Sequence, residues 1–253
     1  MNAFALALKS AAAEPLTALP FLVSAGGYKK DPARAFLRRQ PGFLGRNLTL
    51  EAAKSLKAAA DAASLETVLF SEEDIKFPPA PLKAVKIEPK GSGFYAHAGG
   101  DPAFVKYEDI NIIAAAAYDK PAAPTAAADL KPGVFDGIMR LAGVETYRPA
   151  SRQPPKETFF RADIIAGNGA MRLLLEPESL DFSPLGPGRS HSSLTNFRTL
   201  LDTLAAPAFH AAKNAFLQAF LAGRPLTQLK VAGPEAADIE LSRLLLLTSK
   251  RSK

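Results

Sequence analysis

A proline-rich run, Phe77-Pro78-Pro79-Ala80-Pro81, separates two stretches of chain whose apolar residues follow different periods. Before this run, apolar residues recur at helical spacing between short strand-like segments. After it, apolar and polar residues alternate, as in strands with one buried face. Because proline interrupts both helices and strands, we interpret residues 77–81 as a linker. We therefore expect two modules, at residues 1–76 and 82–253.

The first module alternates strand and helix patterns. Residues 3–9 alternate small and large side chains and predict a strand, and Phe43–Leu48 and Leu65–Phe70 predict two more. Helical spacing fills the gaps, with Asp31 and Thr49 as the N-caps of two helices. This order predicts a small ferredoxin-like α/β module over residues 1–76.

The second module begins with strands and ends with helices. The strands are expected as a hairpin at 85–96, a strand from about Ala103, and strands at Asn111–Tyr118, Thr158–Ile165 and Met171–Leu175. Residues 119–157, which are rich in proline and alanine, are interpreted as a surface insertion. The helices are expected after a cap at Thr195 or Asn196, at 208–222 and at 235–247, although residues 244–248 also fit a strand.

The stretch Phe104-Val-Lys-Tyr-Glu-Asp-Ile-Asn-Ile-Ile113 resembles the third-strand region of bacterial pleckstrin-homology-like (PH-like) domains, in which a polar bend leads into a core strand. The later strands and the closing helix follow the same order, so the resemblance covers residues 82–205. It implies an antiparallel β-barrel closed at one end by the helix from Asn196. PH-like domains are recognition folds that bind lipid headgroups, peptides or other domains. The expected fold class is therefore α+β, a ferredoxin-like module followed by a PH-like barrel with C-terminal helices.

Composition removes several classes of protein. The chain is 47% hydrophobic and carries a formal net charge of only +6, so a disordered protein is excluded. It has no cysteine, which excludes disulfide scaffolds and cysteine-ligated metal centres. No basic residue precedes the N-terminal apolar stretch, and no apolar run approaches the roughly 20 residues of a membrane span. We expect a cytoplasmic protein without a transmembrane segment.

One short region holds much of the positive charge. Residues 28–46 contain a single acid, Asp31, and the basic residues Lys29, Lys30, Arg34, Arg38, Arg39 and Arg46. Arg34 and Arg38 are four residues apart and share a helix face. Such a face suits phosphates or acidic side chains, and its alternative is an ordinary solvated helix surface.

A second candidate is the loop Gly186-Pro187-Gly188-Arg189-Ser190-His191, which precedes a helix. Backbone N–H groups, Arg189, Ser190 and His191 could converge on an anion there. It lacks the Gly-Lys-Ser/Thr ending of a nucleotide-binding phosphate loop. An ordinary capping loop is the alternative.

The sequence shows no catalytic constellation, because it has no Gly-x-Ser-x-Gly elbow, no cysteine nucleophile and no histidine pair at metal-binding spacing. We expect no cofactor and no metal site. The favoured hypothesis is a non-enzymatic binding or scaffolding protein that recognises a protein partner. The alternatives are binding of nucleic acid or an anionic membrane surface through residues 29–46, and an enzyme whose site is assembled from scattered residues.

Overall fold

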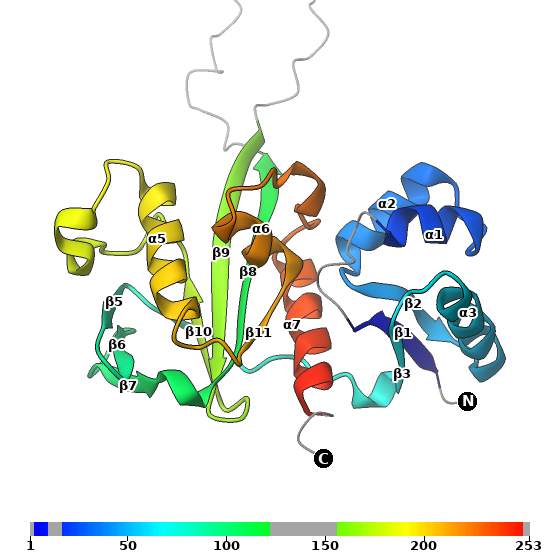
Figure 1. Ribbon diagram of the computed structural model, residues 1–253, viewed down its shortest axis with the longest axis horizontal. Helices are drawn as coiled ribbons and strands as arrows, with labels where there is room; N and C mark the ends of the chain where they lie inside the picture. The colour runs from blue at the N-terminus through cyan, green and yellow to red at the C-terminus, as the bar shows by residue number, and fades with distance from the viewer. Residues whose placement is uncertain (1–2, 10–16, 122–155, 250–253) are drawn as a thin grey trace, which may run out of the picture. The chain divides into compact units, whose positions relative to one another are not determined.

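The computed structural model describes residues 3–9, 17–121 and 156–249 (Figure 1). Helices account for 40% and strands for 29% of the structure, which confirms a mixed α+β chain. Within these ranges, no helix combines the length and the apolar character needed to cross a membrane.

The chain divides into two units. Met1–Tyr118 and Phe160–Lys253 together form one compact unit, and Asp119–Phe159 forms the other. In the second unit, the Thr158 hydroxyl donates a 2.9 Å hydrogen bond to the Asp119 carboxylate. The expected insertion at 119–157 falls mostly on residues 122–155, which lie outside the described residues.

The first sheet contains antiparallel strands in the order β2-β1-β3. Its strands are β1 Phe4–Leu8, β2 Phe43–Leu48 and β3 Thr67–Ser71. The neighbouring helical segments are α1 Ala18–Ser24, α2 Lys30–Arg39, α3 Leu50–Ala62 and the 3-10 turn η2 Glu72–Asp74. The core of this region is made largely of leucines, which include Leu6, Leu8, Leu22, Leu37 and Leu44.

One of the two predicted N-caps in this region is confirmed. The Thr49 hydroxyl accepts a hydrogen bond from the Ala52 N–H at 3.2 Å and so begins α3. The N-cap prediction for Asp31 is wrong, because α2 begins at Lys30 and Lys29 occupies the N-cap position. Asp31 instead lies in the first turn, where its negative charge still suits the helix N-terminus.

The strands after the linker form two further sheets in the described chain. The antiparallel sheet β5-β6-β7 contains β5 Lys86–Pro89, β6 Gly93–His97 and β7 Ala103–Lys106, and the turn η3 Tyr107–Asp109 follows it. The larger sheet has the order β11-β8-β9-β10-β4. Its strands are β4 Leu82–Lys83, β8 Ile110–Pro121, β9 Lys156–Ala166, β10 Met171–Leu175 and β11 Ala212–Lys213.

One apolar core joins these two sheets to helix α5 Ser193–Ala205. It contains Phe94 and Val105 from the smaller sheet, Ile164 from the larger sheet, and Phe197 and Leu201 from α5. None of the sheets in the described ranges closes into a barrel, so the closed barrel that the resemblance implies is not seen.

The structure corrects two helix starts. Ser192 caps α5 by accepting from the Thr195 N–H at 3.3 Å, so neither Thr195 nor Asn196 is the cap. Helix α6 Ala215–Leu221 begins after Asn214 and not at residue 208. Asn214 is the N-cap of α6, because its carboxamide oxygen accepts from the Leu217 N–H at 3.1 Å. The same oxygen accepts from the Ala115 N–H of β8. The remaining turns are η5 Ser183–Gly188 and η6 Thr227–Leu229.

The last helix, α7 Pro234–Ser249, settles the ambiguity at residues 244–248 in favour of helix. It is buried on two sides. Leu241 and Leu244 pack against Ile112 and Ile165 of the larger sheet. Leu246 joins a separate cluster with residues of the first sheet, Ala5, Ala7, Phe43 and Phe70. A helix with apolar residues on all sides shows little amphipathic contrast, which explains why its sequence pattern was ambiguous.

Helix α7 also carries a fully buried charged residue, Arg243. Its guanidinium donates to both carboxylate oxygens of Glu240, at 2.7 and 3.0 Å, and to the Leu8 carbonyl in β1 at 2.7 Å. Gly42 lies against it with a φ of +76°, and a Cβ atom there would stand 2.1 Å from the Arg243 Nε. Glycine is therefore required at this position by both its backbone conformation and the space available.

Replacing Arg243 tests this arrangement. Arg243→Met leaves the Glu240 carboxylate buried without its partner, and we expect a loss of about 3–5 kcal/mol of unfolding free energy in urea titrations. Arg243→Met with Glu240→Leu leaves neither charge in the core, and we expect it to recover most of that loss. If the unfolding free energy of Arg243→Met alone lies within about 0.5 kcal/mol of the wild-type value, this role of Arg243 is contradicted.

Candidate functional site

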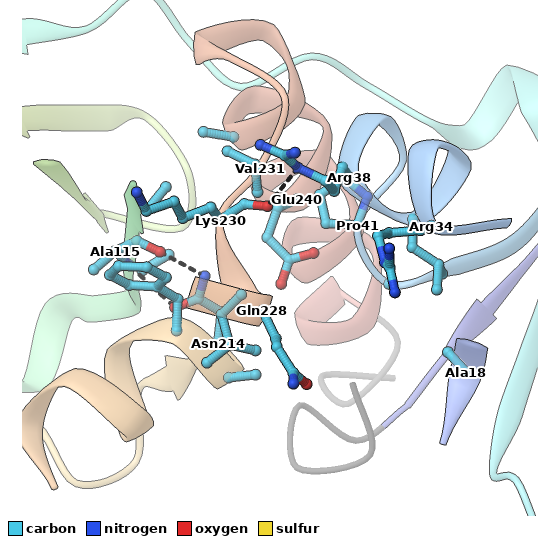
Figure 2. Close-up of a pocket in the computed structure, with 18 of the residues that line it drawn as sticks. Ala18, Arg34, Arg38, Pro41, Ala115, Asn214, Gln228, Lys230, Val231 and Glu240 are labelled. Atoms are coloured by element: carbon cyan, nitrogen blue, oxygen red, sulfur yellow. Dashed lines mark hydrogen bonds between the residues drawn. The ribbon is translucent and has the colours of Figure 1, made fainter. Parts of the chain in front are cut away.

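A cavity of about 530 Å³ opens in the compact unit (Figure 2). Its lining comes from helices α1, α2, α6 and α7, from strands β8 and β9, and from the segment 227–231. Figure 2 shows Arg34 and Arg38 of α2 on one side and Ala115 and Asn214 on the other. This volume falls within the range of small-ligand sites.

The cationic side of the cavity comes from one helix face. Lys30, Arg34 and Arg38 follow one another at four-residue intervals along α2, so their side chains lie on the same face. All three are exposed and line the cavity. Asp31 stands 3.6 Å from Arg34, but this carboxylate is 90% exposed and the pair is weak. The face therefore keeps a positive charge toward the cavity.

The segment 227–231 forms the adjoining wall and adds Lys230 to the lining. Arg38 holds this segment in place, because its Nε donates to the Lys230 carbonyl at 3.3 Å. The Ala232 N–H donates back to the Arg38 carbonyl at 2.8 Å, and the Val231 N–H donates to the Ala117 carbonyl of β8 at 3.0 Å. Helix α2 and strand β8 thus fix the wall from two directions.

The lining also has an apolar part, to which β8 contributes three alanines. Ala114, Ala115 and Ala116 line the cavity together with Phe216 and Leu241. The backbone at Ala115 is satisfied by Asn214, whose carboxamide accepts from its N–H at 3.1 Å and donates to its carbonyl at 2.8 Å.

Two carboxylates also line the cavity, and both are already paired with buried guanidinium groups. Glu240 is bound by Arg243. Asp163 lies 2.8 Å from both Arg161 and Arg172. Burial raises the pKa of the Asp163 carboxyl, and the two guanidinium groups act in the opposite direction. The charge that a ligand meets is therefore set by the cations of the rim.

The structure separates the predicted basic residues. Lys30, Arg34 and Arg38 meet at the cavity, and Lys29 and Arg39 do not line it. Lys29 is exposed at the N-cap of α2. Arg39 donates to the Ala35 carbonyl of its own helix at 3.3 Å.

Arg46 lies on β2, and its side chain is bound by residues close to the first sheet. Its guanidinium donates to both carboxylate oxygens of Glu72 at 2.7–3.0 Å and to the Gln40 side chain at 3.0 Å. The Glu72 carboxylate also accepts from the Asn47 N–H at 2.7 Å. This ion pair connects β2 to the residue that follows β3. We therefore interpret the role of Arg46 as structural.

The predicted loop at 189–191 does not contribute to the cavity lining. Ser190 is engaged by Asn196, which accepts from its N–H at 2.6 Å and donates to its carbonyl at 2.8 Å. Arg189 and His191 are exposed. Hydrogen bonds from Ser183 lower the pKa of the Asp181 carboxyl, and the charges of Lys86 and then Arg189 lower it further. The positive charge of Arg189 therefore acts on a neighbouring acid.

Several lining residues were not singled out from the sequence. Lys230, Glu240 and Asn214 lie far from α2 along the chain, and only the fold brings them together. The spacing of Glu240 and Arg243 on a helix indicates a paired acid and base, but it does not show that both are buried.

Comparison of the chain with protein-family models, with curated proteins and with solved structures found no match. The site is therefore interpreted from its own geometry.

The pairing of Arg46 with Glu72 predicts a specific pH dependence. Burial raises the pKa of the Glu72 carboxyl, but Arg46 and the Asn47 N–H outweigh it and hold that pKa below its ordinary 4.5. The stabilisation is therefore present above the unfolded-state pKa and is lost as the pH falls through the lower folded-state pKa.

We expect Glu72→Gln to cost about 1–3 kcal/mol of unfolding free energy near pH 7. The difference from the wild type should shrink as the pH is lowered below the ordinary pKa of Glu72. Urea unfolding measured across the acid range checks this, and a difference that stays constant or grows toward acid would contradict the assignment.

Proposed function

We propose that this protein is a non-enzymatic binding protein that recognises an acidic segment of a partner protein at the cavity beside α2. The observation that carries the proposal is the arrangement of charge around an apolar space. Lys30, Arg34 and Arg38 line one side, and the alanines of β8 form an uncharged part of the lining. Both lining carboxylates are paired with arginines. A segment with acidic side chains and an apolar residue matches both surfaces.

A protein segment fits this site better than a nucleic acid does. Single-stranded nucleic acids are held by cationic grooves in which exposed aromatic rings stack on the bases. The ring in the cavity lining, Phe216, is 4% exposed and packs against Phe160 and Phe220. It therefore cannot present its face to a base. The cations also border a hollow of limited volume, whereas a membrane surface requires a broad basic face.

The proposal includes the finer fold assignment. The alternation of strands and helices in β1–α1–α2–β2–α3–β3 is the support for a ferredoxin-like fold over residues 1–76, and its three antiparallel strands are one fewer than that fold has. The meander β5–β6–β7, the following long strands and α5 support a PH-like relative for residues 82–205, because they share one core. Location in the cytoplasm is part of the same proposal. An experimental structure checks the fold, and cell fractionation checks the location.

Charge reversal on one helix tests the function. The probe is a fluorescein-labelled peptide of alternating glutamate and leucine, followed by fluorescence anisotropy. We expect Arg34→Glu with Arg38→Glu to raise the Kd at least about tenfold, because both side chains face the cavity. The matched control is Lys29→Glu with Arg39→Glu, which makes the same charge change on α2 outside the lining. We expect it to change the Kd less than about twofold.

The comparison ligands decide between classes of partner. A peptide with lysine in place of glutamate should not bind. Equal loss of affinity in both double variants would contradict the proposal, because it would show general charge attraction. Tighter binding of a single-stranded oligonucleotide, or of phosphatidylserine vesicles, would overturn it in favour of nucleic acid or a membrane surface.

A further inference from the structure

A second surface, away from the cavity lining, centres on Phe209. This side chain is 83% exposed, and it contacts the neighbouring His210 ring edge-on at 5.7 Å between centroids. A single exposed phenylalanine is ordinary on a protein surface. The surroundings of this ring distinguish it from an ordinary exposed one.

The backbone of the turn that carries Phe209 is fixed by hydrogen bonds. The Lys213 ammonium donates to the carbonyls of Ala208, Phe209 and Ala211 at 2.9, 3.4 and 3.3 Å. The Ala211 N–H also donates to the Ala208 carbonyl at 3.1 Å. Because these bonds fix the backbone, little backbone freedom remains to be lost when the ring is buried by a partner.

A shallow hollow lies directly beside this ring. It has a volume of about 600 Å³, and its lining includes Phe209 and His210 on one side and Lys106, Tyr107 and Glu108 on the other. Lys106 and Phe104 are two residues apart on β7, so both lie on the outer face of that sheet. Phe104 pairs there with Tyr95 across the strands, with ring centroids 5.0 Å apart, and both rings are about 40% exposed.

We propose that this Phe209 surface, made of Phe209, His210, Lys106 and Glu108, is the interface between two copies of this chain. It goes beyond the proposed function and does not depend on it. A projecting ring next to a hollow is self-complementary, because a twofold axis places the ring of each copy in the hollow of the other. The hollow is large enough to receive one phenylalanine side chain.

The charges of the surface favour a second copy over other occupants. Residues 28–46, where much of the positive charge of the chain is concentrated, are not part of this surface. Lys106 and Glu108 are 3.2 Å apart and sum to zero within this surface. Across a twofold axis, Lys106 of one copy can face Glu108 of the other. An anionic membrane surface would meet a cation that is already paired.

The first test measures mass against concentration by sedimentation equilibrium. We expect the wild type to form dimers as the concentration rises, and Phe209→Glu to raise the dimer dissociation constant at least about tenfold. Phe77→Glu is the matched control, because Phe77 is 81% exposed and outside this surface. It should dimerise as the wild type does. Because Phe209 is exposed, its variant should unfold at the same temperature as the wild type, which circular dichroism checks.

The second test uses charge to identify the occupant as another copy. Lys106→Glu places two acids on each surface, and Glu108→Lys places two bases there, so each variant alone should be monomeric. An equimolar mixture of the two should form a heterodimer, because opposite charges then meet. A wild type that stays monomeric at every concentration, or a mixture that stays monomeric, would overturn the proposal. Dimerisation unaffected by Phe209→Glu would overturn it as well.

Discussion

The candidate site depends on the hydrogen bonds that the buried Arg243 guanidinium makes to Glu240 and to the Leu8 carbonyl. The guanidinium joins α7 to β1 through the Leu8 carbonyl and neutralises Glu240 at the cavity wall. Because α7 also packs Leu241 and Leu244 on the larger sheet, the helix connects the two parts of the compact unit that supply the lining. Without this guanidinium, the wall of the cavity would carry an unpaired carboxylate and would repel the acidic ligand that we propose.

A second set of ion pairs fixes the other end of α7. Arg161 bridges Asp163 and Asp238, with closest atoms 2.8 and 2.7 Å apart, and so connects β9 to the helix. Desolvation offsets much of the attraction between buried charges, so the pair of Arg161 with the buried Asp163 adds little net stability. We interpret these ion pairs as the reason α7 keeps one position between its two apolar clusters. The cavity is then a preformed space bordered by α2, which matches the low reorganisation that tight binding requires.

Local features of the site could be predicted from the sequence, and distant pairings could not. The four-residue spacing of Lys30, Arg34 and Arg38 places them on one face whatever they contact. Arg46 has the same charge, but its partner Glu72 is 26 residues away, and spacing along the chain carries no information about that contact. Lys230 is 192 residues from Arg38 and reaches the site only through the fold. Helix α7 was ambiguous because its apolar residues face two cores.

The most direct test of the account is a map of where an acidic ligand binds. Amide NMR spectra recorded during titration with the glutamate–leucine peptide would show which backbone groups respond. The account predicts shifts at Ala114–Ala116, along α2 from Lys30 to Arg38, and at residues 227–231, three segments that meet at the cavity. Shifts confined to α3 or to the outer face of β6 and β7, with these segments unchanged, would contradict it.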